Sequence, residues 1–317
     1  MFFTVFTTTF SAIAKVFLVA LVAGFLVRRS IIGMDKIKAL SDVTVKVFLP
    51  ALTFSNVITT FRPGQNPQWW ILPLVGFSVP VLFMGITALF YLSDLRANMN
   101  KFPVASLQNV GYLVLPVGQI LYPQEFDRFA LYVFLLILGF NIALWTVGKV
   151  LVSYQVGKTE LRLAEMITPP FVANVLAILM VFLGLHKFFP DIILQPIEIL
   201  GQAAIPLGMF ILGATLGGIS LKQLPPLKDI LKIAFVKYIL MPAFAVFLLL
   251  KIFPNTDSLL SDVLVIEASA APAANLLVIV QKYGGDYRLI GALVLVMYIL
   301  AVIAMPVWLA VWKLVVA

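Results

Sequence analysis

Continuous apolar runs of about twenty residues recur along this chain, and each has the length that spans a bilayer as an α-helix. Backbone polar groups find no water inside the hydrocarbon, so only helices and closed barrels can cross it. The strands of a barrel alternate apolar and polar residues over about ten positions, whereas these runs do not alternate. The runs therefore predict an all-α polytopic membrane protein.

The composition agrees with this prediction and excludes several functional classes. Hydrophobic residues make up 62% of the 317 residues and charged residues 11%, against about 45–50% and about 25% in soluble domains. The net charge of +8 does not indicate nucleic acid, because the lysines and arginines lie between apolar runs. Cysteine is absent, which excludes disulfides and thiolate metal sites. We therefore expect the lipid bilayer as a partner, no nucleic acid and no cofactor.

The apolar runs predict ten membrane-spanning helices with short connections. The first run ends at Arg28 and Arg29, whereas a cleaved signal peptide carries its positive charge before the apolar core, so we expect this run to stay as a span. The central connection divides the chain into a first repeat of residues 1–154, a linker of residues 155–168 and a second repeat of residues 169–317. The predicted spans are 10–27, 39–58, 69–92, 103–122, 128–153, 169–187, 192–217, 229–252, 260–281 and 289–312.

Positive charge is distributed unevenly between the two sets of connections. Fourteen of the 22 lysines and arginines lie after odd-numbered spans, and five lie after even-numbered spans or at the C-terminus. Cytoplasmic loops carry the excess of positive charge in membrane proteins. The bias predicts that both termini lie outside the cytoplasm.

An odd number of spans in each half would orient the two halves oppositely. This inverted-repeat arrangement is common among secondary transporters. Three pairs of residues share an offset of 156 positions between the halves: Pro50 with Pro206, Pro116 with Pro272, and Gln119 with Asn275. The pairs fall within spans of equal rank, which favours two inverted five-helix repeats.

Spans 4 and 9 are unusual because each combines a central proline with several amides or hydroxyls. Proline removes a backbone donor and frees a carbonyl of the preceding turn. Discontinuous helices of this kind place half-helix N-termini, with their positive dipole ends, near the middle of the bilayer. The pattern predicts broken crossover helices and an anion site between them. The alternative is an ordinary proline kink whose buried amides join neighbouring helices.

Four short motifs in these and neighbouring spans resemble one transporter family. They are Leu49-Pro50-Ala51-Leu52 in span 2, Asn109-Val-Gly-Tyr with Pro116 in span 4, Ala271-Pro272-Ala273-Ala274-Asn275 in span 9, and Lys282-Tyr283-Gly284-Gly285 after it. In order and spacing they are similar to the auxin efflux carrier family, which includes the plant PIN proteins and bacterial organic-acid permeases. The short central connection is unlike the long hydrophilic loop of the plant members and matches a bacterial-type member.

The resemblance implies a fold and a mechanism. It implies two inverted five-helix repeats in which spans 4 and 9 cross at broken, proline-marked points. It also implies a scaffold of spans 1, 2, 6 and 7, often dimeric, and a mobile domain of the remaining spans. We expect a secondary transporter of the plasma membrane, the inner membrane in a bacterium, that moves small carboxylates by an elevator-like motion.

The candidate site residues cluster around the two prolines. Glu267 lies five residues before Pro272 and is the carboxylate best placed to take a proton, with a structural hydrogen bond as the alternative. Lys46 and Lys237 could attract an anion or extend toward the cytoplasmic surface, and Asn141 is expected to form an interhelical hydrogen bond. The predicted substrate-binding residues are Asn109, Gly111, Pro116, Gln119, Pro272 and Asn275.

Other functional classes fit the sequence less well. Sodium coupling requires several convergent oxygens, and Glu267 is the carboxylate near the predicted crossover, which favours proton coupling or a facilitator. A sodium- or proton-coupled carrier of another class on a similar fold remains the alternative. A zinc protease needs two histidines, and the chain has one, His186. We therefore expect no enzymatic activity, and the short loops disfavour a receptor or scaffold protein.

Overall fold

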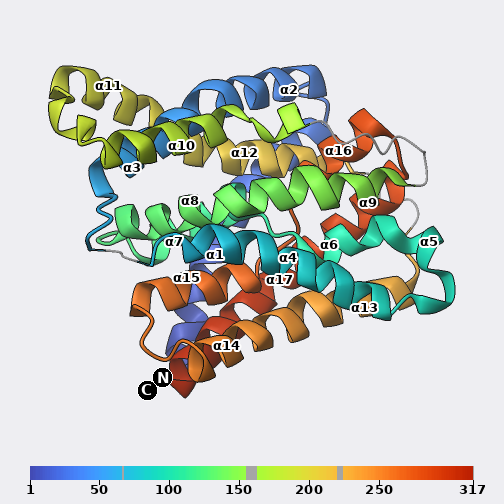
Figure 1. Ribbon diagram of the computed structural model, residues 1–317. Coiled ribbons are helices and arrows are strands. Elements are labelled where there is room, and N and C mark those ends of the chain that lie inside the picture. The colour runs from blue at the N-terminus through green and yellow to red at the C-terminus, as the bar shows by residue number, and fades with distance from the viewer. Residues whose placement is uncertain (66–67, 155–162, 220–223, 317) are drawn as a thin grey trace.

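The computed structural model describes residues 1–65, 68–154, 163–219 and 224–316, and their regular elements are helices (Figure 1). Seven helical stretches in these ranges are long and apolar enough to cross a membrane. They are α1 (Phe2–Arg28); α2 (Met34–Val43) continuing through η1 (Thr44–Phe48) into α3 (Leu49–Thr60); α4 (Ile71–Leu89); α8 (Phe126–Ala143) through η5 (Leu144–Gly148) into α9 (Lys149–Ser153); α11 (Asp191–Gln202) into α12 (Ala204–Gly217); α13 (Leu227–Phe235) through η9 (Val236–Leu240) into α14 (Met241–Lys251); and α17 (Tyr287–Val315).

These stretches correspond to predicted spans 1, 2, 3, 5, 7, 8 and 10. Predicted span 6 is α10 (Pro169–Phe182), which is shorter than expected because Gly184, at φ 73°, turns the chain into the left-handed region. Predicted spans 4 and 9 are each interrupted. The count of ten spans and the inverted repeat therefore remain predictions, and much of the predicted linker lies outside the described residues.

Short helical turns occupy the connections between the long helices. They are η2 (Leu92–Asp94), α5 (Leu95–Asn98), η3 (Met99–Lys101), η7 (Leu163–Met166) and η8 (Leu185–Phe188).

Wide π turns precede three of the intrahelical prolines. Pro50, Pro116 and Pro242 each lie two residues after a π turn, namely η1, η4 (Val110–Val114) and η9. Proline has no N–H and its ring clashes with the carbonyl of the preceding turn. A wider turn moves that carbonyl away from the ring, so the helix continues through the proline.

Glycines allow two pairs of helices to pack backbone against backbone. A Cβ on Gly213 of α12 would lie 2.0 Å from the Ala20 carbonyl oxygen of α1, and a Cβ on Gly139 of α8 would lie 1.7 Å from the Pro73 carbonyl oxygen of α4. Such close approach is how membrane helices associate without a hydrophobic driving force. The pairs α1–α12 and α4–α8 are therefore tightly joined.

The remaining helices pack around these two pairs. The helices α3, α10 and α11 pack together near α12, whereas α14, α15 (Ser258–Ala268) and α17 lie on the side of α4 and α8 (Figure 1). The first and last helices, α1 and α17, pack against each other, and both chain ends lie in the same region of the molecule (Figure 1). The two interrupted spans therefore lie among the long helices and contact helices of both groups.

Candidate functional site

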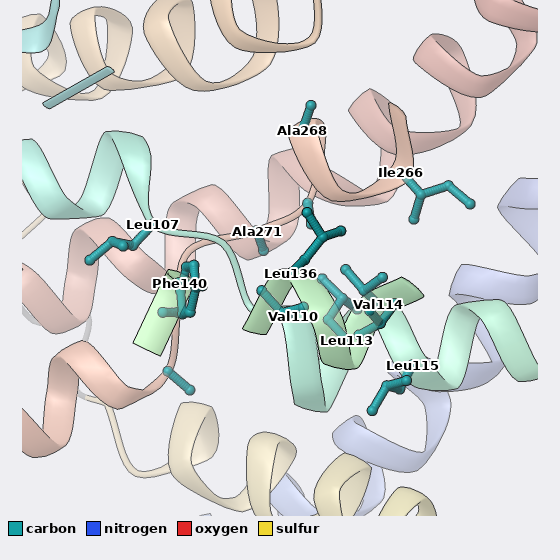
Figure 2. Packing of buried hydrophobic residues seen from close by; sticks show 14 of the residues in the cluster. Leu107, Val110, Leu113, Val114, Leu115, Leu136, Phe140, Ile266, Ala268 and Ala271 are labelled. Carbon is teal, nitrogen blue, oxygen red and sulfur yellow. The ribbon is translucent and has the colours of Figure 1, made fainter. Parts of the chain in front are cut away.

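Predicted spans 4 and 9 are both broken, and their breaks cross. Span 4 consists of α6 (Phe102–Ser106), an extended stretch, and then η4 with α7 (Leu115–Leu121). Span 9 consists of α15 (Ser258–Ala268), a non-helical stretch and α16 (Asn275–Tyr283). Figure 2 shows the two extended stretches side by side, with Leu107 and Val110 flanking one, Ala271 on the other, and Ala268 at the end of the helix that precedes it. The prediction that these two helices are interrupted is confirmed.

Backbone hydrogen bonds join the two breaks as a minimal antiparallel bridge. Gln108 faces Pro272 across the bridge. The Asn109 N–H donates to the Ala271 carbonyl at 2.8 Å, and the Ala273 N–H donates to the Leu107 carbonyl at 3.0 Å. Unpaired backbone groups are costly inside a bilayer. Each break therefore supplies hydrogen-bond partners for the other.

Two helix N-termini lie at this crossover. The helix of η4 and α7 begins at Val110, directly after the bridge, and α16 begins at Asn275. The first turn of a helix carries a partial positive charge, and here the N–H groups of Tyr112, Leu276 and Leu277 also have acceptors within the chain. Both N-termini can therefore attract an anion to the crossover.

The break in span 4 is not at its proline. Pro116 lies in the first turn of α7, seven residues after Asn109, whereas Pro272 lies in the bridge itself. The π turn of η4 moves the clashing carbonyl away from the ring of Pro116, so the helix that begins at Val110 continues through this proline. The residue that faces Pro272 is Gln108, so the expectation that span 4 breaks and crosses at Pro116 is wrong, whereas the offset of 156 between the two halves stays a prediction.

The side-chain oxygen and nitrogen of Asn109 each form a hydrogen bond that stabilises the crossover. Its side-chain oxygen accepts a hydrogen bond from the Tyr112 N–H at 3.1 Å, and its nitrogen donates to the hydroxyl of Tyr298 on α17. Asn109 is 6% exposed and Tyr298 is fully buried. The predicted ligand residue thus has a structural role, and Tyr298 was missed because it lies 189 positions away in sequence.

The other predicted substrate-binding residues do not all converge. A Cβ placed on Gly111 would meet nothing within 4 Å, so there is open space beside the start of the helix. The side chain of Asn275 is exposed at the start of α16. Gln119 is exposed nine residues after Val110, roughly 14 Å further along the helix. The crossover therefore brings together Asn109, Gly111 and Pro272 with the start of α16, but not Gln119.

Glu267 lies in the last turn of α15, just before the crossover. It is 8% exposed, and its carboxyl group has no side-chain or backbone partner among the described residues. It lines a cavity of about 270 Å³ that also contacts Gln108. The alternative interpretation of Glu267 as a structural hydrogen-bond partner has no contact to support it in the described part of the chain.

Lys237 and Lys46, both predicted to lie within spans, differ in burial and in hydrogen-bond partner. Lys237 in η9 is fully buried, and its ammonium group donates to the Leu107 carbonyl at 3.3 Å, so the expectation that it extends to the cytoplasmic surface is wrong. Lys46 is exposed and pairs with Asp42 at 2.6 Å. Sequence reasoning placed Lys237 within a span but had no means to place it beside the crossover.

A buried carboxylate near the middle of α15 connects this helix to α17 and to the end of α7. Asp262 pairs with Lys313 at 2.6 Å and accepts hydrogen bonds from the Tyr122 hydroxyl at 2.9 Å and the Trp312 indole at 3.1 Å. A second buried carboxylate, Asp229 of α13, pairs with Lys101 of η3 at 2.6 Å. Both carboxylates are fully partnered and serve the packing of the crossover helices.

The end of the central connection is attached to α9 and α16 by a charged cluster. Glu165 pairs with Lys149 and accepts a hydrogen bond from the Tyr283 hydroxyl, and Lys282 lies 3.6 Å away. Burial alone would raise the pKa of Glu165, but these donors and positive charges outweigh it and lower the pKa below its usual 4.5. Beside this cluster, Asn141 donates to the Met166 carbonyl at 2.6 Å, which gives it a structural role.

The described residues contain no group of three or more histidine, aspartate or glutamate side chains that could hold a metal ion. The crossover thus offers hydrogen-bond donors, two helix N-termini and buried charges, a set suited to binding and releasing a solute.

Comparisons with known proteins agree with this arrangement. Residues 8–309 match the family model described as membrane transport protein. An uncharacterized transporter of Methanocaldococcus jannaschii is 26% identical over 287 residues, which cover 88% of this chain and 90% of that protein. The resemblance predicted from the motifs is confirmed, and the chain belongs to the membrane transport protein family, the family of the auxin efflux carriers.

Proposed function

We propose that this protein is a secondary transporter that moves a small organic anion, a carboxylate, across the plasma membrane. The observation that carries the proposal is the crossover, where the helices beginning at Val110 and Asn275 start next to a hydrogen-bonded bridge. Half-helix N-termini at the middle of the bilayer bind anionic groups in several transporter folds. The carboxylate would bind between these two N-termini.

Three features of the crossover support an anionic substrate. The space beside Gly111 lets a ligand approach the first N–H groups of the helix closely. The exposed amide of Asn275 can donate to a carboxylate oxygen. Lys237 brings a buried amino group next to the bridge, and an anion bound beside it would favour the charged form of this group.

Proton coupling through Glu267 is part of the proposal. A buried carboxyl group without a partner can bind a proton at little cost, since desolvation disfavours its charged form. A sodium-coupled carrier of another class would need several converging oxygens, and no such cluster of carboxylates lies in the described residues. We therefore favour a proton-coupled carrier over a sodium-coupled one.

Alternating access would follow from the arrangement that the family suggests. In this proposal ten spans form two inverted five-helix repeats, and both termini lie outside the cytoplasm. Predicted spans 1, 2, 6 and 7 act as a scaffold, through which two copies can dimerise. The remaining spans carry the crossover through the membrane in an elevator-like motion. The tightly packed pairs α1–α12 and α4–α8 would each remain rigid within their own part.

Uptake of radiolabelled mono- and dicarboxylates into proteoliposomes tests the proposal. Asn275→Ala should weaken carboxylate binding tenfold or more, since a hydrogen bond to a charged group is worth about 1.5–3 kcal/mol. The control is Gln195→Ala, which removes an exposed amide from α11, and it should leave uptake unchanged. An absence of uptake for every carboxylate would contradict the proposed substrate class.

Glu267→Gln separates coupling from transport. In this variant a pH gradient should no longer drive uptake, while carboxylate exchange at equal pH continues. If uptake in the variant still follows the gradient as in the parent protein, Glu267 does not carry the proton.

A further inference from the structure

A cavity beside Glu267 has a lining that differs from the residues of the proposed carboxylate site. It has a volume of about 270 Å³ and extends along one face of α15, from Asp257 before the first turn to Glu267 in the last. Residues of α4, α8 and α14 form its other walls. None of the six predicted substrate-binding residues lines it. A ligand of this cavity would therefore not compete directly for the groups at the two helix N-termini.

The charged groups that line the cavity are both acidic. Asp257 lies at one end, where it pairs with Arg128 at 3.1 Å and caps α15 by accepting from the Leu260 N–H at 3.0 Å. Glu267 lies at the other end without a partner in the described residues. Among the residues that the structure describes, no lysine, arginine or histidine lines the cavity. A carboxylate ligand would thus find no positive charge to pair with, whereas a ligand with a cationic hydrogen-bond donor would favour the ionised form of Glu267 and pair with it.

The walls of the cavity are mostly apolar and include aromatic rings. Trp69, Tyr132 and Phe244 line it together with aliphatic side chains such as Leu136 and Leu264. A cavity of about 150 Å³ lined by apolar side chains holds one benzene ring, so this one holds a body of one to two rings. Aromatic faces also attract organic cations. A bare metal ion would leave these walls unfilled and would lack the several oxygen ligands that it needs.

We propose that this cavity binds a hydrophobic organic cation, whose protonated amine pairs with Glu267 and whose apolar body fills the space between α4, α8, α14 and α15. The proposal does not depend on the carboxylate site. It requires a cation that enters from the end bearing Asn255 and Thr256.

Binding of 4-phenylbutylamine and 4-phenylbutanol to the full-length protein in lipid nanodiscs tests this proposal. The two probes share one apolar body and differ in the cationic group, so partition into lipid can be subtracted with empty nanodiscs. Isothermal titration should show the amine binding at least tenfold more tightly than the alcohol. Equal affinities, or no measurable binding of the amine at millimolar concentration, would overturn the proposal without any variant being made.

Three variants locate the bound amine. Glu267→Gln should reduce amine affinity at least tenfold and leave alcohol affinity unchanged, whereas Glu198→Gln, outside the cavity, should change neither. Ala245→Trp should fill the cavity and abolish binding of both probes. Amine affinity that stays the same in Glu267→Gln would also overturn the proposal. Carboxylate binding measured on the same samples reports separately on the proposed transport function.

Discussion

Replacing Asn109 by alanine should destabilise the protein, because its amide caps one helix and holds another. The N-cap oxygen contributes about 1 kcal/mol, and the hydroxyl of Tyr298, buried at 0% exposure, would lose its partner at a cost of about 1–3 kcal/mol. Together these effects amount to about 2–4 kcal/mol. At about 2 °C per kcal/mol for a chain of this size, the melting temperature should fall by about 4–8 °C.

Thermal unfolding in detergent, followed by intrinsic fluorescence, measures this effect. Tyr298→Phe provides the matched variant, since it removes the hydroxyl and leaves the amide nitrogen of Asn109 without its acceptor. If the two groups act through one hydrogen bond, the double variant should be less destabilised than the sum of the single variants. An Asn109→Ala protein that melts at the parent temperature, yet binds carboxylate tenfold more weakly, would refute the structural role and make Asn109 a ligand contact.

Three further predictions concern packing, pH and topology. Gly139→Ala should lower stability by about 1–3 kcal/mol because its Cβ meets backbone, whereas Gly85→Ala, in open space within α4, should be neutral or stabilising in the same melting assay. The lowered pKa of Glu165 contributes stability that is present above pH 4.5 and lost as the pH falls below it; Glu165→Gln should therefore weaken the dependence of the melting temperature on pH below pH 4.5. Cysteines at position 157, which lies outside the described residues, and at Asn255 should be labelled by an impermeant maleimide from opposite sides of the membrane.

The sequence predicts the helices of this fold better than the geometry of its site. Long apolar runs are sufficient to locate the seven spanning stretches, since the bilayer restricts a chain to helices of that length. The same analysis identified spans 4 and 9 as broken, from their prolines and amides. It placed one break at Pro116, because a proline signal does not distinguish a helix interruption from a proline that a continuous helix accommodates with a π turn.

Contacts between distant segments were beyond sequence reasoning. Tyr298 and Lys237 lie far along the chain from Asn109 and Leu107, and no local pattern marks them as neighbours. Gln108 was passed over in favour of Gln119, although the bridge places Gln108 at the crossover and Gln119 lies exposed along the helix. Pairings of this kind depend on how complete helices pack, which one sequence without relatives does not specify.

The backbone bridge at the crossover has a consequence for how the protein is made. The Asn109 N–H and the Leu107 carbonyl find their partners in Ala271 and Ala273, which the ribosome adds long after span 4 has entered the membrane. Until then these polar groups must be satisfied by water or by the insertion machinery, since hydrocarbon offers them nothing. Span 4 therefore reaches its final depth only when span 9 emerges, and a nascent chain halted before Ala271 should leave residues 107–109 accessible to water-soluble reagents.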